Sequence, residues 1–298
     1  MNYAISNGYR AIRTHIDTYL SQDEKIWNEI FNLRKEYSHL LELQFVALAP
    51  LEFWSTLNGE ILAKKLTDNN GLLGGVLVPP FNDKEVHSSL SYLMELAMRF
   101  NLGVDLHVDE SSFQPGRGIK LLLNTVDKLN CKIPITCSHS SSILLLKNRE
   151  IHKLGKRIAE RNIKVVALPL TNFWLLNRDQ NNNSLQRPVA PIKQLQKSFV
   201  DVAIGSDNVQ DPWYPFGNFD PFYLMSHAMP MLQLNPWERL SLSALINAPS
   251  RLLGLNWDGI LSVGCPADFV LVEGKNWGDI FSNNLKRKVL IKGNWYQK

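Results

Sequence analysis

The sequence predicts an α/β fold of the (β/α)8 TIM-barrel type, and three observations support this prediction. Apolar segments rich in β-branched residues recur about every thirty residues, the length of a strand–helix–strand unit. The segments between them carry the apolar spacing of helices. Polar or titratable residues follow the ends of several apolar segments, namely Asp17, Glu110, His139, Asn172 and Asp207. A barrel collects such groups at one mouth, where active sites of this fold lie.

Seven strands are predicted, each a nearly continuous apolar run of the kind found in a parallel sheet covered on both faces. Residues 84–101 illustrate the intervening helices, because Val86, Leu90, Leu93 and Ala97 fall on one stripe. An open doubly wound sheet has the same rhythm, but the G-x-G-x-x-G sequence of its dinucleotide-binding form is absent. The predicted strands cover residues 9–16, 43–48, 72–78, 104–107, 133–139, 165–170 and 200–205.

A complete barrel has eight strands, and the first predicted strand begins close to Met1. We therefore expect a barrel over residues 1–255 that lacks its first strand, with that strand placed upstream. After Asp207 the pattern changes to helical segments around 222–234 and 237–253. Residues 256–298 are predicted to form a small β-sandwich-type appendage with strands at 268–272 and 288–292, because they are too few for a separate core.

The composition is that of an ordinary folded protein, with 45% hydrophobic and 20% charged residues and a net charge of +4. No block of Lys and Arg indicates a nucleic-acid groove, and no stretch approaches the ~20 apolar residues that cross a bilayer. The three cysteines form no C-x-x-C pair, and we expect a cytoplasmic protein with reduced thiols. Exposed sheet edges beside the missing strand would favour a homo-oligomer.

The first candidate site segment is Gly103-Val-Asp-Leu-His-Val-Asp-Glu110, a predicted strand that ends in a histidine and acids. A lone histidine at a strand end is more often structural, but acids beside it at a barrel mouth favour a functional role. Side chains alternate along a strand, so Asp105, His107 and Asp109 are predicted to share a face. Glu110 can join His107 only if the chain has left the strand and turned inward.

Two further segments end in candidate residues. His139 closes Ile135-Thr-Cys-Ser-His139, with a helix-capping serine beside an incidental histidine as the alternative interpretation. Asp207 follows a buried-looking strand and Gly205, with a helix-capping aspartate as the alternative. Together His107, His139 and Asp207 would stand on the fifth, sixth and eighth barrel strands and converge on one mouth.

This set of side chains indicates metal-assisted hydrolysis. Histidine and aspartate are suitable ligands for Zn²⁺ or Fe²⁺, and a bound metal lowers the pKa of water from about 15.7 toward about 7. Glu110 could then carry protons to a leaving nitrogen. The H-E-x-x-H, H-x-E…P-C-x-x-C, G-x-S-x-G and P-loop motifs of other enzyme classes are absent.

Several of these motifs resemble the cytosine deaminase-like members of the amidohydrolase superfamily, in the same order along nearly the whole chain. The similar segments are Arg13-Thr-His-Ile-Asp17, His107-Val-Asp-Glu110, Thr136-Cys-Ser-His139, Leu168-Pro-Leu-Thr-Asn172, Gly205-Ser-Asp-Asn-Val-Gln-Asp-Pro-Trp-Tyr-Pro215 and Gly264-Cys-Pro-Ala-Asp268.

The resemblance implies a barrel of the metal-dependent hydrolase type and assigns roles to individual residues. It implies that His107 and Asp207 bind one divalent metal ion, zinc or iron, and that Glu110 is a proton shuttle. Asp207 would also accept a proton from the attacking water, and His139 would hydrogen-bond the water or the substrate. It further implies that Trp213 packs against the substrate ring, and we also expect Asn172 and Asn208 to bind substrate. The reaction implied is hydrolytic deamination of a small-molecule substrate, with release of ammonia.

Three departures from the family pattern shape the functional hypotheses. The family's H-x-H metal pair is absent among the seven histidines, its substrate-binding glutamine is replaced within Ala49-Pro-Leu-Glu52, and its H-D-D run reads Ser206-Asp207-Asn208. The first hypothesis is therefore a deaminase of an amino-substituted heterocycle, a cytosine-like pyrimidine or a related cyclic amidine. The alternative is an N-terminally truncated, catalytically impaired homologue without an intact metal site.

Overall fold

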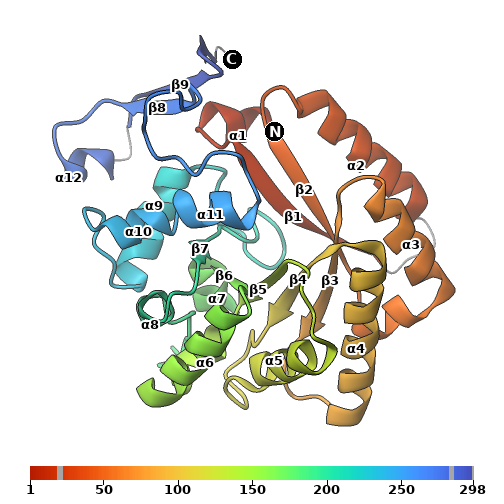
Figure 1. Cartoon of the computed structure of the whole chain (residues 1–298). Coiled ribbons are helices and arrows are strands. Elements are labelled where there is room, and N and C mark those ends of the chain that lie inside the picture. The colour runs from red at the N-terminus through yellow and green to blue at the C-terminus, as the bar shows by residue number, and fades with distance from the viewer. Residues whose placement is uncertain (19–22, 282–284, 297–298) are drawn as a thin grey trace.

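The computed structural model describes residues 1–18, 23–281 and 285–296 of the chain. Its centre is a curled seven-stranded sheet in which every strand pairs in parallel with the next one along the chain (Figure 1). The order runs from β1 to β7, with these two strands at the edges. The strands are β1 (Ala11–Asp17), β2 (Glu42–Leu48), β3 (Leu72–Leu77), β4 (Gly103–Val108), β5 (Ile135–His139), β6 (Lys164–Ala167) and β7 (Val202–Ile204).

Helices follow the strands and cover the outer face of the sheet (Figure 1). The apolar core lies between these two layers. The first half of the chain contains α1 (Asn2–Ser6), α2 (Asp23–Tyr37), η1 (Leu51–Ser55), α3 (Leu57–Thr67), α4 (Asp83–Phe100) and α5 (Arg117–Leu129). The second half contains η2 (Ser141–Leu145), α6 (Asn148–Glu160), α7 (Pro169–Leu175), α8 (Ile192–Lys197), α9 (Pro221–Met231), α10 (Arg239–Ser243), α11 (Asn247–Leu252) and α12 (Trp277–Ile280).

The predicted α/β architecture is confirmed, and each of the seven predicted strands overlaps an observed one. The helix predicted at 84–101 is α4, whose first turn is capped by Asn82 through its side-chain oxygen and the backbone N–H of Lys84. Asn101 ends α4 in the left-handed conformation, with a φ of 51°. The eighth strand, expected upstream, stays a prediction.

The stretch predicted to be helical around 237–253 is helical in the structure, where it is divided into two short helices, α10 and α11. Pro249 lacks an N–H and would break a continuous helix, whereas in the first turn of α11 its missing donor costs nothing. The Asn247 side chain, which donates to the backbone oxygen of Asp258, fixes the start of α11. Within the described residues, we find no helix with the length and apolarity needed to span a lipid bilayer.

The last part of the chain forms a separate three-stranded antiparallel sheet, in the order β10 (Asn294–Trp295), β9 (Arg287–Ile291), β8 (Phe269–Val272). The strands predicted at 268–272 and 288–292 correspond to β8 and β9. Side chains tie this sheet to distant segments: Arg10 pairs with Asp268 at 3.1 Å, and Arg287 makes two bonds of 2.7 Å to Asp220. The domain boundary between residues 255 and 256 stays a prediction.

A layer of polar side chains crosses the interior of the main sheet. The Arg13 guanidinium of β1 donates to the Asp105 carboxylate of β4 at 2.9 Å and to the Thr136 hydroxyl of β5 at 3.0 Å. It also donates to the Gln44 side chain of β2 and to the backbone oxygen of Leu252 at the end of α11. These bonds join β1 to four other segments directly beneath the candidate site.

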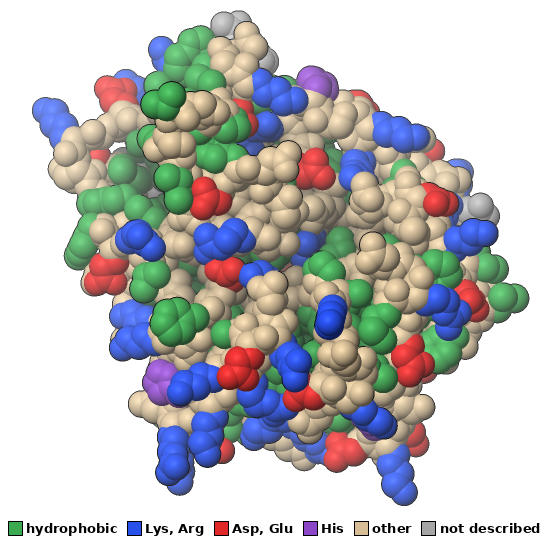
Figure 2. Space-filling view, viewed as in Figure 1, with side chains coloured by type: hydrophobic (Ala, Val, Ile, Leu, Met, Phe, Trp, Pro, Cys, Tyr) green, Lys and Arg blue, Asp and Glu red, His purple; other side chains and the backbone are tan. Residues whose placement is uncertain are grey.

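Acidic side chains are interspersed with Lys and Arg over much of the face seen in Figure 2. Asp127, for example, pairs with both Arg157 and Arg161 at 2.7 and 2.6 Å. One carboxylate of α5 therefore offsets the charge of two arginines at the end of α6.

Candidate active site

The turn that follows β4 directs Glu110 toward the other candidate residues. β4 ends at Val108, and Asp109 takes the left-handed conformation with a φ of 54°. The buried Asp109 carboxylate accepts the backbone N–H groups of Gly118 and Ile119, at 2.8 and 3.0 Å, and so caps the start of α5. The expectation that Asp109 faces the site with His107 is wrong. Because the chain turns at this residue, Glu110 points inward instead.

Glu110, His139, Asn172 and Asp207 meet at the carboxyl ends of β4 to β7. His139 Nδ1 lies 3.4 Å from a Glu110 oxygen and 4.0 Å from an Asp207 oxygen. The Asn172 amide nitrogen lies 2.9 Å from the same Nδ1 and donates to Glu110 at 3.5 Å. His139 and Asp207 have left-handed backbones, with φ values of 67° and 62°, so each side chain is aimed by a turn at the end of its strand.

Burial shifts the pKa of each ionisable group in this cluster. Burial, helped by the Asp207 charge, raises the pKa of Glu110 to about 8. Burial raises the pKa of Asp207 to about 6. Burial and the neighbouring His107 hold the pKa of His139 well below its usual range. The cluster therefore contains a neutral imidazole beside two carboxyl groups that hold protons more firmly than in water.

His107 lies between His139 and a second histidine that sequence analysis did not select. The His107 ring is 4.7 Å from the His139 ring and 4.8 Å from the ring of His15 on β1, measured between centroids. His15 Nε2 is 3.5 Å from the buried Asp105 carboxylate, which the Arg13 guanidinium also contacts. Strand alternation could have indicated His15, because it follows Arg13 by two residues and so lies on the same face of β1.

The three predicted substrate-binding residues, Asn172, Asn208 and Trp213, differ in burial and in their contacts. Asn172 is fully buried within the cluster. Asn208 follows Asp207 but its amide donates to Asp211 at 2.6 Å, and Trp213 lies on the same loop with its ring two-thirds exposed. The structure thus brings Asn172 together with the catalytic candidates and places Asn208 and Trp213 on the adjoining loop.

The cluster contains nitrogen and oxygen atoms of the chemical types that bind metal ions. His107 Nδ1, His139 Nε2 and Asp207 Oδ2 are buried without a hydrogen-bond partner among the described residues, and imidazole and carboxylate are the ligands that zinc and iron prefer. Within the described part of the chain, however, no three His, Cys, Asp or Glu side chains are spaced to hold an ion together. The described residues therefore fit as a partial ligand set.

Comparison with known proteins identifies the class to which this fold and site belong. The amidohydrolase family model Amidohydro_3 matches residues 47–293, so the chain belongs to the amidohydrolase family, whose members hydrolyse C–N bonds. The cytosine deaminase-like resemblance is confirmed at the level of this superfamily.

Individual relatives cover almost all of this chain. A pterin deaminase from Rhizobium rhizogenes is 28% identical over 97% of this chain and 66% of its own length. An N-isopropylammelide isopropyl amidohydrolase from Pseudomonas is 23% identical over 97% of this chain and 68% of its own. The chain spans about two thirds of the length of these curated relatives. The structure of a 5-methylcytosine deaminase from Klebsiella pneumoniae shares the fold, with a TM-score of 0.84, 22% identity, and 99% and 73% of the two chains covered.

Proposed function

We propose that this chain carries the site of a hydrolytic deaminase that acts on an amino-substituted nitrogen heterocycle and releases ammonia. One observation carries the proposal: Glu110, His139, Asn172 and Asp207 converge from the ends of successive strands within hydrogen-bond or ion-pair range of a common point. Active sites of this fold are built at that mouth. Family membership favours this hypothesis over that of a non-catalytic homologue.

In the proposed reaction, each residue of the cluster has a separate chemical role. Asp207 accepts a proton from the attacking water as the water oxygen bonds to the ring carbon that bears the amino group. Glu110 protonates the ring nitrogen beside that carbon and then carries the remaining hydroxyl proton to the amino nitrogen. The carbon–nitrogen bond breaks, ammonia leaves and the ring carbon becomes a carbonyl, after which Asp207 returns its proton to Glu110. His139 orients the water and the ring, and Asn172 fixes the His139 ring through Nδ1.

A divalent metal ion, zinc or iron, would acidify the attacking water when bound. The resemblance assigns its binding to His107 and Asp207, and each of them has a buried atom without a hydrogen-bond partner in the described part of the chain. Two protein ligands leave further coordination positions open for other groups.

The proposed substrate class rests on the names of the relatives and on the positions where this sequence differs from the cytosine deaminase pattern. The relatives are named for action on a pterin and on N-isopropylammelide, and the solved structure for action on 5-methylcytosine. Ala49-Pro-Leu-Glu52 and Ser206-Asp207-Asn208 differ from the cytosine deaminase pattern. An amino-substituted heterocycle other than cytosine is therefore the favoured substrate.

The test is ammonia release by the purified full chain, supplied with zinc or iron, from a panel of aminopyrimidines, aminotriazines, pterins and cyclic amidines. Asp207→Asn and Glu110→Gln should each lower turnover at least about a hundredfold, the usual size of an acid–base contribution. Glu60→Gln, which alters an exposed carboxylate paired with Arg99, is the matched control and should turn over like the wild type. Near-normal turnover by Asp207→Asn would place the site elsewhere, and no ammonia from any compound would refute the proposed function.

A further inference from the structure

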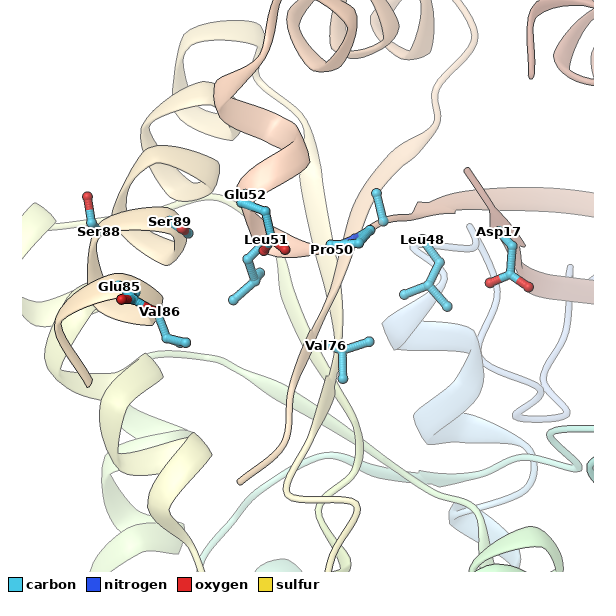
Figure 3. Close-up of a pocket in the computed structure, with 11 residues that line it drawn as sticks. Asp17, Leu48, Pro50, Leu51, Glu52, Val76, Glu85, Val86, Ser88 and Ser89 are labelled. Atoms are coloured by element: carbon cyan, nitrogen blue, oxygen red, sulfur yellow. The ribbon is translucent and has the colours of Figure 1, made fainter. Parts of the chain in front are cut away.

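A pocket of about 890 Å³ opens at the carboxyl ends of β1, β2 and β3 and the start of α4 (Figure 3). In Figure 3, Asp17 and Leu48 stand on one side, Glu85 and Val86 of α4 on the other, and Val76 of β3 between them. The remaining lining residues are Ala49, Pro50, Leu51, Glu52, Ser88 and Ser89. None of these eleven residues belongs to the catalytic cluster.

Strand register nevertheless places the pocket directly beside that cluster. Val76 pairs with His107 across β3 and β4, so their side chains are neighbours on one face of the sheet. Asp17 follows His15 by two residues on β1 and pairs with Leu48 of β2. The pocket floor is therefore continuous with the row of histidines that leads to His139.

Val76 is unusual among the strand residues of the main sheet. Its side chain is 48% exposed, and in the described residues it is the only large hydrophobic residue of β1 to β7 that is exposed. Interior strand positions of a barrel are normally filled by packed apolar side chains. An exposed valine beside His107 is a surface suited to the face of an apolar or aromatic ligand.

The distance from the reacting centre sets the size of the ligand that can use this surface. His139 lies on β5 and Val76 on β3, and two strand spacings amount to about 10 Å. A fused bicyclic ring system is longer than a single six-membered ring, so a bicycle held at Glu110 and His139 extends further toward Val76. We infer that the preferred substrate is a fused bicyclic aminoheterocycle whose second ring lies over Val76 in this pocket, an inference that rests on the proposed deaminase function.

Charge narrows the substrate class further. Asp17, Glu52 and Glu85 line the pocket, none of them has an ion-pair partner in the described residues, and no Lys or Arg is among the lining residues. An anionic substituent on the second ring would be repelled by these carboxylates. The substrate ring therefore carries neutral or amino substituents at the end that enters the pocket.

The test measures equilibrium binding by calorimetry on the purified, metal-free full chain, with pterin, cytosine and pterin bearing a ring carboxylate as ligands. The wild type should bind pterin about tenfold more tightly than cytosine, and the carboxylated pterin about tenfold more weakly than pterin. Val76→Trp and Val86→Trp fill the pocket from two different walls, and each should bring the pterin-to-cytosine affinity ratio close to one. Ile61→Trp, at a 59% exposed position of α3, is the matched control and should keep the wild-type ratio.

The outcomes separate this inference from the proposed function. Binding of cytosine without a preference for pterin, or an equal loss of both ligands in the two tryptophan variants, would overturn the bicyclic inference and leave a deaminase site in place. No binding of any of the three ligands to the wild type would overturn the bicyclic inference, whereas the proposed function would fall only if no compound of the wider panel released ammonia. Because the two variants lie on different elements, β3 and α4, misfolding of one does not remove the comparison.

Discussion

Replacing Arg13 with methionine tests the polar layer beneath the site. Arg13 donates hydrogen bonds to Asp105, Thr136, Gln44 and the backbone oxygen of Leu252. The Arg13 side chain is 11% exposed and the Asp105 side chain 1% exposed, so water cannot replace the guanidinium. Removing one partner of such a buried pair leaves an uncompensated charge and costs about 3–5 kcal/mol. We expect Arg13→Met to lower the free energy of unfolding by about 4 kcal/mol.

The assay is urea-induced unfolding at neutral pH, followed by tryptophan fluorescence and far-UV circular dichroism. Arg99→Met is the matched control, because Arg99 pairs with Glu60 at 2.6 Å but both side chains are more than 40% exposed. That pair should contribute about 1 kcal/mol or less.

A double variant distinguishes loss of the charge pair from loss of packing. Asp105→Asn removes the buried charge while keeping the shape of the side chain, so adding it to Arg13→Met should recover about 2 kcal/mol of the loss. A loss in Arg13→Met no larger than in Arg99→Met would refute the reasoning. A double variant less stable than Arg13→Met would do the same.

Three further predictions follow from the same region. Asp109→Ala leaves the N–H groups of Gly118 and Ile119 without their acceptor and should lower stability by about 2 kcal/mol in thermal unfolding; an unchanged midpoint would contradict the capping role. Gly118→Ala should cost about 1–3 kcal/mol, since the added Cβ would lie 2.5 Å from the Leu77 oxygen, and a neutral result would show that the backbone yields there. Zinc should raise the unfolding temperature of the wild type, and His107→Ala should lose most of that rise together with bound zinc in elemental analysis; equal zinc contents would remove His107 from the ligand set.

The strands of the main sheet could be predicted because burial on both faces requires nearly continuous apolar runs. Leu43, Phe45, Val46 and Ala47 of β2 are all buried, as the pattern indicated. The apolar pattern of the sequence is a weaker guide to the residue at which a strand ends. β7 covers only Val202–Ile204 of the predicted 200–205, because its end depends on pairing with the short β6.

The convergence of the candidate residues could be predicted from the sequence, but the directions of their side chains could not. Glu110, His139 and Asp207 come together as expected, because carboxyl ends of parallel strands meet at one edge. The alternation of side chains along β4 could not show that Asp109 caps α5 instead of facing the site. That orientation depends on the left-handed backbone of Asp109 and on the position of α5. The contact between Arg13 and Asp105 joins residues 92 positions apart across the sheet interior, and no local pattern specifies it.

The bonds between the small C-terminal sheet and the start of the chain bear on how this protein is made. Arg10 pairs with Asp268, 258 residues further on, and Arg287 donates to the backbone oxygen of Asn7 across 280 residues. At the usual pace of the ribosome, the later partners emerge on the order of 10–50 seconds after the earlier ones. During that interval the segment around β1 has been synthesised but lacks these partners. Chaperones and incorrect strand pairing would compete for it until the last residues are translated.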